Sequence, residues 1–222
     1  MYSQRKFSFA FKVATIVCCL IGVLSNLLKT TSIVSILSFY TMQSNLFVLT
    51  FYTGYFIARL FNPNVEKTKT YHILKGATVM VIFLTFIVYN LSLQSLDFMM
   101  DVKTASYNIL RFSNIFVHFL TPIMVILDYA IFDEKGYFKK SYALIWIVFP
   151  ALYPVYVYTY ARFGGQFFGV GGSKKYAYFF LDIDKIGLDG VLGYLLLFSI
   201  CYFLASLLLI KIDNSLGKRR KK

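Results

Sequence analysis

The chain has 222 residues, 58% of them hydrophobic and only 15% charged, and its formal net charge is +13. Soluble domains average roughly 45–50% apolar and about 25% charged residues, so this composition argues against a soluble domain and predicts a polytopic membrane protein. In a membrane protein, surplus Lys and Arg collect in cytoplasmic segments. The charge is therefore not interpreted as a sign of nucleic-acid binding.

Six apolar segments follow one another, each long enough for the roughly 20-residue helix that crosses a bilayer. We therefore expect an all-α fold in which a single domain, residues 1–222, contains six transmembrane helices. Arg5 and Lys6 precede the first segment as in a signal peptide, but no small-residue cleavage site follows, which favours an uncleaved span. The expected spans are about Phe7–Leu28, Ile36–Phe61, Ile73–Leu93, Tyr107–Phe132, Tyr142–Phe163 and Leu188–Ile210.

Most of the 23 Lys and Arg residues fall on the inner side if the N-terminus is placed inside. The positive-inside rule then predicts that both termini are cytoplasmic. The C-terminal residues 211–222 end in Lys218, Arg219, Arg220, Lys221 and Lys222, and we expect this basic tail to bind anionic lipid.

Polar side chains lie on one face of the second segment. Thr41, Ser44 and Asn45 are spaced i, i+3 and i+4 and so project together from a helix, whereas Gln43 lies off that face. Polar groups at membrane depth are costly and are expected to face protein or water, so this face is predicted to point into the bundle.

The fourth segment carries a similar stripe, formed by Arg111, Asn114, His118 and Thr121 at intervals of three and four residues. Pro122 follows it, and proline interrupts the helical hydrogen-bond ladder, so we expect a kink that opens space beside the imidazole of His118. Further along, Asp128 is expected to pair with a cation of the cytoplasmic side, Lys75 or Arg59.

A threonine hydroxyl becomes a nucleophile when a base removes its proton, and histidine is suited to that role near neutral pH. At 1.5 Å per residue, Thr41 lies about 8 Å and His118 about 16 Å below the outer surface. Both are in the outer half of the bilayer on helices that run in the same direction, and helix tilt would close the gap and bring them into one cavity. Thr41 and His118 are therefore the candidate catalytic pair, although polar residues in helix bundles often only hold helices together. The candidate supporting groups, for an oxyanion or for substrate orientation, are Gln43, Ser44, Asn45, Arg111 and Asn114.

No Cys/His spacing typical of a metal site occurs, and neither a metal nor a cofactor is expected. The longest outer loop, 164–187, is glycine-rich, but its spacing is not that of a phosphate-binding loop and no strand is expected before it. It is interpreted as a re-entrant or capping loop.

The segment Phe39–Leu46, the series Asn114, His118, Pro122 and Asp128, and the loop Tyr178–Asp184 resemble a bacterial family of six-span membrane proteins. That family is similar to the androgen-induced and androgen-dependent TFPI-regulating protein group of animals, which are intramembrane threonine hydrolases of fatty acid esters of hydroxy fatty acids. The resemblance covers the order of the spans across nearly the whole chain. It implies that Thr41 and His118 are the essential pair, and that the protein is integral to a bacterial cytoplasmic membrane.

The chain also departs from the animal group. Its histidine stands one residue nearer to the proline, and Phe179 replaces a proline of the loop motif. These differences leave open a different lipid substrate or a protein without hydrolase activity.

The sequence is therefore compatible with three functions. The first is a hydrolase in which His118 deprotonates Thr41 for attack on a lipid ester, or a lipid-like ester, that enters from the bilayer. The second is a non-enzymatic lipid- or small-molecule-binding subunit or transporter component, in which Ala10 and Ala14 of the first span contact a partner helix. The third is a structural membrane protein without a ligand.

Overall fold

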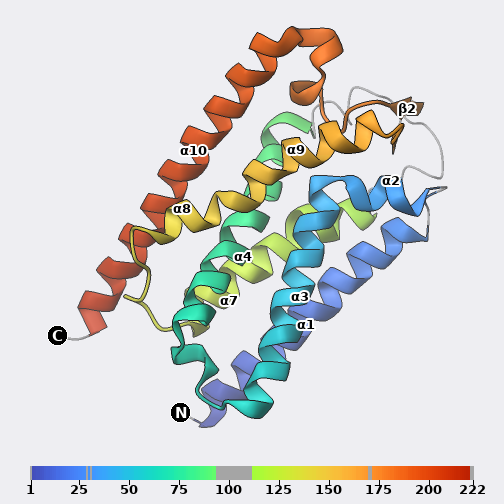
Figure 1. Cartoon of the computed structure of the whole chain (residues 1–222). Helices are drawn as coiled ribbons and strands as arrows, with labels where there is room; N and C mark the ends of the chain where they lie inside the picture. Colours follow the sequence, from blue (N-terminus) through green and yellow to red (C-terminus); the bar gives the residue numbers. More distant parts are fainter. Residues whose placement is uncertain (1, 29, 31, 94–111, 170–171, 221–222) are drawn as a thin grey trace.

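The computed structural model describes residues 2–28, 30, 32–93, 112–169 and 172–220, and most of these residues are helical (Figure 1). The described strands, β1 (Phe167–Gly169) and β2 (Gly172–Lys174), form a short antiparallel hairpin in which Phe167 pairs with Lys174. The helical elements in chain order are α1 (Tyr2–Leu27), α2 (Ile33–Ser38), α3 (Tyr40–Phe61), the 3-10 turn η1 (Val65–Lys67), α4 (Lys69–Val88), the π-helical turns η2 (Tyr89–Leu93) and η3 (Phe116–Leu120), α7 (Thr121–Phe132), α8 (Tyr142–Trp146), α9 (Val148–Arg162), the 3-10 turn η4 (Phe179–Leu181) and α10 (Ile183–Arg220).

The all-α class predicted from the sequence is confirmed, and the lengths and compositions of the helices agree with a membrane protein. Five described helical segments are long and apolar enough to cross a membrane. These segments are Arg5–Leu27, Lys69–Leu91, Phe112–Phe132, Tyr142–Arg162 and Ile183–Lys218. Helix α3 has 22 residues but is not among them. Its first turns hold Thr41, Gln43, Ser44 and Asn45, which lower its hydropathy.

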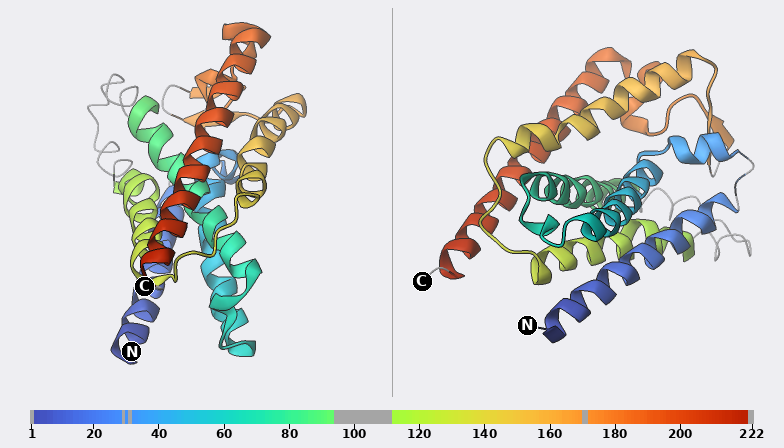
Figure 2. Two further views of the ribbon diagram at one scale, coloured as in Figure 1. Left: turned by 90° about the vertical axis from the view of Figure 1, so that its left-hand side faces the viewer. Right: turned by 60° about the horizontal axis from the view of Figure 1, so that its bottom comes forward.

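The helices form layers around a central pair. Helices α3 and α4 lie between α1 and α7 on one side and the arm formed by α8, α9 and α10 on the other (Figure 2). The arm is joined to the bundle through Trp146 of α8, whose ring approaches Gly76 of α4 so closely that a Cβ atom at Gly76 would lie 2.0 Å from a ring carbon. The Trp146 indole also donates a hydrogen bond to the carbonyl of Ile73 at 2.9 Å.

The segment Ile36–Phe61, predicted as one span, is divided at Phe39. The backbone of Phe39 is extended (φ −71°, ψ 141°), so α2 ends at Ser38 and α3 begins at Tyr40. The Ser38 hydroxyl donates to the Val34 carbonyl at 2.7 Å, a bond that competes with the backbone ladder at the end of α2. As a result, Thr41 occupies the first turn of α3.

A π-helical turn precedes Pro122, at the place where the sequence predicts a kink. Pro122 has no N–H to donate to the carbonyl four residues earlier, and its ring would clash with that carbonyl in a regular helix. The chain widens locally, and the amide of Thr121 donates five residues back to the Phe116 carbonyl. The wider turn η3 carries His118.

The sequence predicts a basic tail at 211–222. Over the part that the structure describes, this segment continues helix α10 and does not extend away from it. Helix α10 continues to Arg220, and Asp213 is fully buried. The Asp213 carboxylate accepts hydrogen bonds from the Tyr129 hydroxyl at 2.7 Å and from the amides of Gly136 and Phe138 at 2.9 and 3.0 Å. Because these contacts connect α10 with the loop after α7, the start of the basic segment is part of the folded protein.

Candidate functional site

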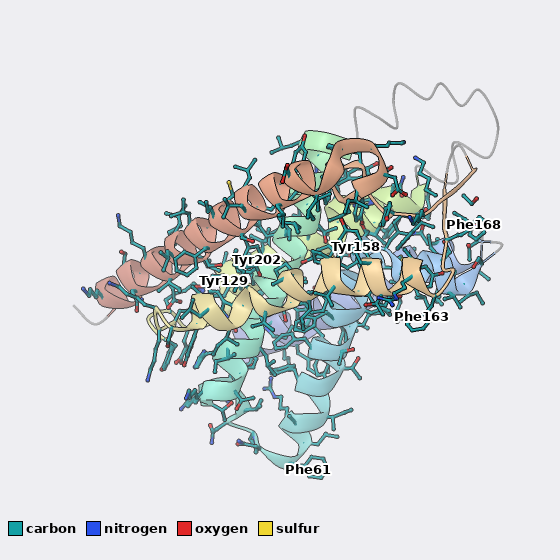
Figure 3. All side chains as sticks on the ribbon, turned by 45° about the horizontal axis from the view of Figure 1, so that its top comes forward. Phe61, Tyr129, Tyr158, Phe163, Phe168 and Tyr202 are labelled. Atoms are coloured by element: carbon teal, nitrogen blue, oxygen red, sulfur yellow. The ribbon has the colours of Figure 1, made fainter. Side chains whose placement is uncertain are left out.

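A cavity of about 280 Å³ lies where the arm diverges from the central helices. Its walls come from α3, α4, α8–α9, α10 and the turn η4. Tyr202 of α10 stands at the junction of α10 with α8, where its hydroxyl donates to the Trp146 carbonyl at 3.1 Å (Figure 3). This volume is close to the lower limit of the range that is typical of ligand pockets, about 300–1,000 Å³. The residues that line the cavity include Tyr40, Thr41, Tyr89, Tyr153, Tyr178 and Phe180.

The cavity opens sideways between α9 and α10. Ala151 and Val155 on α9 and Ser199 on α10 line it and are exposed, Val155 by 62%. The two helices meet near α8 and diverge above it (Figure 1). The opening is therefore flanked by the same apolar helix faces that would contact lipid.

The turn η4 covers the cavity on the side of the outer loop. Phe180 and Leu181 line the cavity and are buried, and the Tyr158 hydroxyl of α9 donates to the Leu181 carbonyl at 2.9 Å. The hairpin nearby is fixed to α2, because the Ser35 hydroxyl accepts from the Phe168 amide at 2.7 Å. Tyr178, Phe180 and Leu181 of the loop 164–187 thus form a roof above the cavity.

Hydroxyl groups gather where α3 begins. Phe39 at the N-terminal cap position makes no side-chain capping bond, and the Tyr178 phenol lies beside the first residues of α3, where it interacts with Thr41 and with the Tyr40 backbone. The Tyr153 hydroxyl donates to the Ser38 carbonyl at 3.2 Å beside them. Burial raises the pKa of the Tyr178 phenol above its ordinary value, although its hydrogen bond with Thr41 acts in the opposite direction. Tyr178 is therefore a neutral hydrogen-bonding group at physiological pH.

His118 lies behind one wall of the cavity. Its ring is only 7% exposed and stacks on the ring of Tyr89, with centroids 3.7 Å apart and planes at 9°. Tyr89 lines the cavity, whereas His118 does not. The Nδ1 atom of His118 is buried without a hydrogen-bond partner.

Thr41 and His118 are carried by neighbouring elements but are not hydrogen-bonded to each other in the structure. The side-chain amide of Asn45 donates both to the Thr41 carbonyl at 2.8 Å and to the Val117 carbonyl at 3.2 Å, which places the first turn of α3 against η3. Thr41 faces the cavity and His118 faces the back of Tyr89. The Tyr89 ring, which lines the cavity and stacks on the imidazole, separates His118 from the space that Thr41 faces.

The other predicted site residues have different surroundings. Ser44 donates to the Thr41 carbonyl at 2.9 Å and bonds with the Thr85 hydroxyl at 2.7 Å, while Asn45 also accepts from the Cys19 thiol at 3.4 Å. These groups are used in joining α1, α3, α4 and η3. Gln43 and Asn114 are partly buried and do not line the cavity, and Arg111 lies outside the described residues.

A second polar cluster, which does not line the cavity, includes the predicted pair of Asp128 with Lys75. Both lysines of this cluster bind one carboxylate, since Lys75 contacts Asp128 Oδ2 and Lys12 Nζ lies 2.8 Å from Asp128 Oδ1. The Tyr52 hydroxyl donates to Asp128 at 2.8 Å, and Lys75 also lies 3.2 Å from Asp133. The pairing with Lys75 is confirmed, and Lys12 on α1 is an additional partner that sequence spacing did not indicate.

Among the described residues, no group of three or more His, Cys, Asp and Glu side chains is placed to hold a metal ion. Comparisons with protein-family models, curated proteins and solved structures gave no match to this chain.

Proposed function

We propose that this protein is an integral membrane protein that takes up a single acyl lipid from the bilayer into the cavity beside Thr41. The observation that carries this proposal is the shape of the cavity, which is roofed by η4 and opens between α9 and α10. A ligand that enters between two apolar helices comes from the hydrocarbon layer. Apolar side chains such as Leu195 and Phe198 would contact its chain.

The polar end of the ligand is assigned to the start of α3. The hydroxyl-bearing side chains of Thr41, Tyr153 and Tyr178 lie together on one wall of a mostly apolar cavity. A few placed polar groups in an apolar pocket typically fix the orientation of a ligand. The hydroxyls suit a carboxyl or ester group, which accepts hydrogen bonds through its carbonyl oxygen.

For the membrane arrangement, we propose six spans with both termini on the cytoplasmic side of a bacterial cytoplasmic membrane, α3 being the sixth spanning helix. Both chain ends lie at the same end of the bundle, as an even number of crossings requires (Figure 1). The connections at that end carry Lys67, Lys69, Lys139 and Lys140, in agreement with the positive-inside rule. Lys and Arg at the end of α10 would contact anionic lipid.

The hydrolase hypothesis is a second candidate, favoured because Thr41 lines the cavity and a single ring separates the cavity from His118. In that reaction His118 takes the Thr41 proton, and the Thr41 oxygen attacks the ester carbonyl. The alcohol leaves with the proton, and water then hydrolyses the acyl-threonine. Labelling by a lipid fluorophosphonate that disappears in both Thr41→Ala and His118→Ala would support it, and labelling that persists in both would exclude it.

The binding proposal is tested with a palmitic acid that carries a photoreactive diazirine. The protein in lipid nanodiscs is irradiated with this probe, and the crosslinked peptides are identified by mass spectrometry. Ala151→Trp places an indole in the opening of the cavity, and we expect it to abolish crosslinking to η4 and α10.

The matched control is Leu152→Trp, at the next position of α9, where the side chain is 59% exposed and does not line the cavity. This variant should retain the crosslinks at the level of the unsubstituted protein. Equal crosslinking in both tryptophan variants would contradict uptake through the opening between α9 and α10.

A further inference from the structure

We propose that the cavity has a second, inner compartment at His118, and that the ring of Tyr89 closes it. This inference rests on the proposed function, because it assigns a further contact to the same ligand. The compartment would receive the carboxyl or ester group of an acyl lipid when Tyr89 swings away. The ligand then meets the imidazole as well as the hydroxyls of Thr41 and Tyr178.

The first argument is the position of Tyr89. One face of its side chain borders the cavity, while its ring lies parallel to the imidazole of His118 at 3.7 Å. Nothing thicker than one aromatic ring therefore stands between the cavity and the imidazole. In the proposed open state, a change in the side-chain torsions of Tyr89 joins the two spaces.

The second argument is the unpartnered nitrogen of His118. A buried polar atom without a hydrogen bond costs about 1–3 kcal/mol, and native structures contain few of them. Nδ1 of His118 is one of three such side-chain atoms among the described residues. A ligand carbonyl or carboxyl group that reaches the imidazole would satisfy this nitrogen.

The third argument is the backbone around both rings. Tyr89 begins the π-helical turn η2, and His118 is the central residue of the π-helical turn η3. π-Helical turns are rare and occur frequently at functional sites. The turns η2 and η3 face each other through the stacked rings of Tyr89 and His118. The irregular backbone that follows α4 and the irregular backbone that precedes α7 therefore meet behind the cavity wall.

The experiment uses the fact that the chain has only two histidines, His72 and His118. The full-length protein in nanodiscs is treated with diethyl pyrocarbonate, and the modification of each histidine is followed by mass spectrometry of its peptide. His72 lies at the other end of α4, stacks on the exposed Tyr137 and is 6% exposed, about as buried as His118, so it is an internal reference for a general loosening of the fold. Every rate of His118 modification is expressed relative to that of His72.

In the unsubstituted protein we expect slow modification of His118. Tyr89→Ala should accelerate it at least tenfold, whereas Tyr89→Phe retains the stacked ring and should leave it slow. Phe198→Ala is the matched control, because it removes another ring from the cavity wall without touching His118. It should not change the rate, and added palmitic acid should protect His118 in Tyr89→Ala.

Two results would overturn the inference. One is an unchanged rate in a folded Tyr89→Ala variant, and the other is an equal acceleration in Phe198→Ala. If His118 is modified rapidly in Tyr89→Ala but palmitic acid does not protect it, the closed compartment is supported and the acyl lipid is excluded as its occupant. If diazirine crosslinking to η4 and α10 occurs but His118 is still modified slowly in Tyr89→Ala, the proposed function stands and the inner compartment is excluded.

Discussion

At the scale of single residues, Asp128 shows how this bundle accommodates charge. A charged group in a membrane span is costly unless it is paired, and Asp128 has three hydrogen-bonding partners, Lys12, Lys75 and Tyr52. Both lysines are at most 2% exposed. The carboxylate therefore compensates two buried cations at once, one on α1 and one on α4.

Asp128→Asn should strongly destabilise the protein, because it leaves two buried ammonium groups without their shared carboxylate. Removing one partner from a buried ion pair typically costs about 3–5 kcal/mol. The loss is measured as a decrease in the free energy of SDS-induced unfolding. Asp184→Asn breaks the exposed pair with Lys175 and should leave this free energy unchanged, since exposed pairs contribute little. A similar small effect for both variants would show that the cluster is not essential to folding.

At the scale of elements, the contact between α4 and α8 determines where the cavity forms. Gly76 lets the Trp146 ring lie directly against the backbone of α4, and this anchors the arm at its lower part. Above the anchor, α9 and α10 diverge around the residues that line the cavity (Figure 1). The small size of one residue thus positions helices on which the site depends.

Gly76→Ala should separate α8 from α4, because the added methyl group would overlap the Trp146 ring. Overpacking of a filled core costs about 1–3 kcal/mol, and we expect that decrease in unfolding free energy. Gly193→Ala in α10 is the matched control. A Cβ atom there meets no other atom within 4 Å, so the substitution should be neutral or stabilising, by up to about 1 kcal/mol. Unchanged stability in Gly76→Ala would mean that the indole can move at little cost.

At the scale of the whole molecule, the connections between helices alternate between the two ends of the bundle. The loop around Asn64 and both chain ends lie at one end, and the hairpin of β1 and β2 lies at the other (Figures 1 and 2). With the lysine-bearing connections inside, the roof over the cavity faces the outer side of the membrane.

Cysteine labelling in cells tests this orientation. Asn64→Cys should react with a membrane-impermeant maleimide only after the cells are permeabilised, whereas Ser173→Cys should react in intact cells. Both positions are exposed, and the native cysteines Cys18 and Cys19 are buried. The third native cysteine, Cys201, is exposed, so Cys201→Ala is introduced first as the common background of both variants. Labelling of both variants from the same side would mean that an even number of spans separates them, which would contradict the proposed topology. The reverse labelling pattern would place both termini on the outer side.

The amino-acid sequence by itself determined the class of this protein and the neighbourhoods of its polar residues. The free energy of moving side chains from water into hydrocarbon acts locally, so apolar segments, basic ends and the pairing of Asp128 with Lys75 can be inferred from composition and spacing. Thr41 and His118 were likewise identified because polar groups at membrane depth stand out in any apolar segment.

Only the tertiary structure decided how those residues are used. The cavity formed by α3, α4, α9, α10 and η4, and the position of the Tyr89 ring between that cavity and His118, depend on contacts between elements far apart in the chain. In the sequence, Tyr89 resembles an ordinary aromatic residue at the end of a span. Spacing along one helix shows which side chains share a face, but packing against other helices decides which faces meet, and with it whether a hydroxyl and an imidazole share one space.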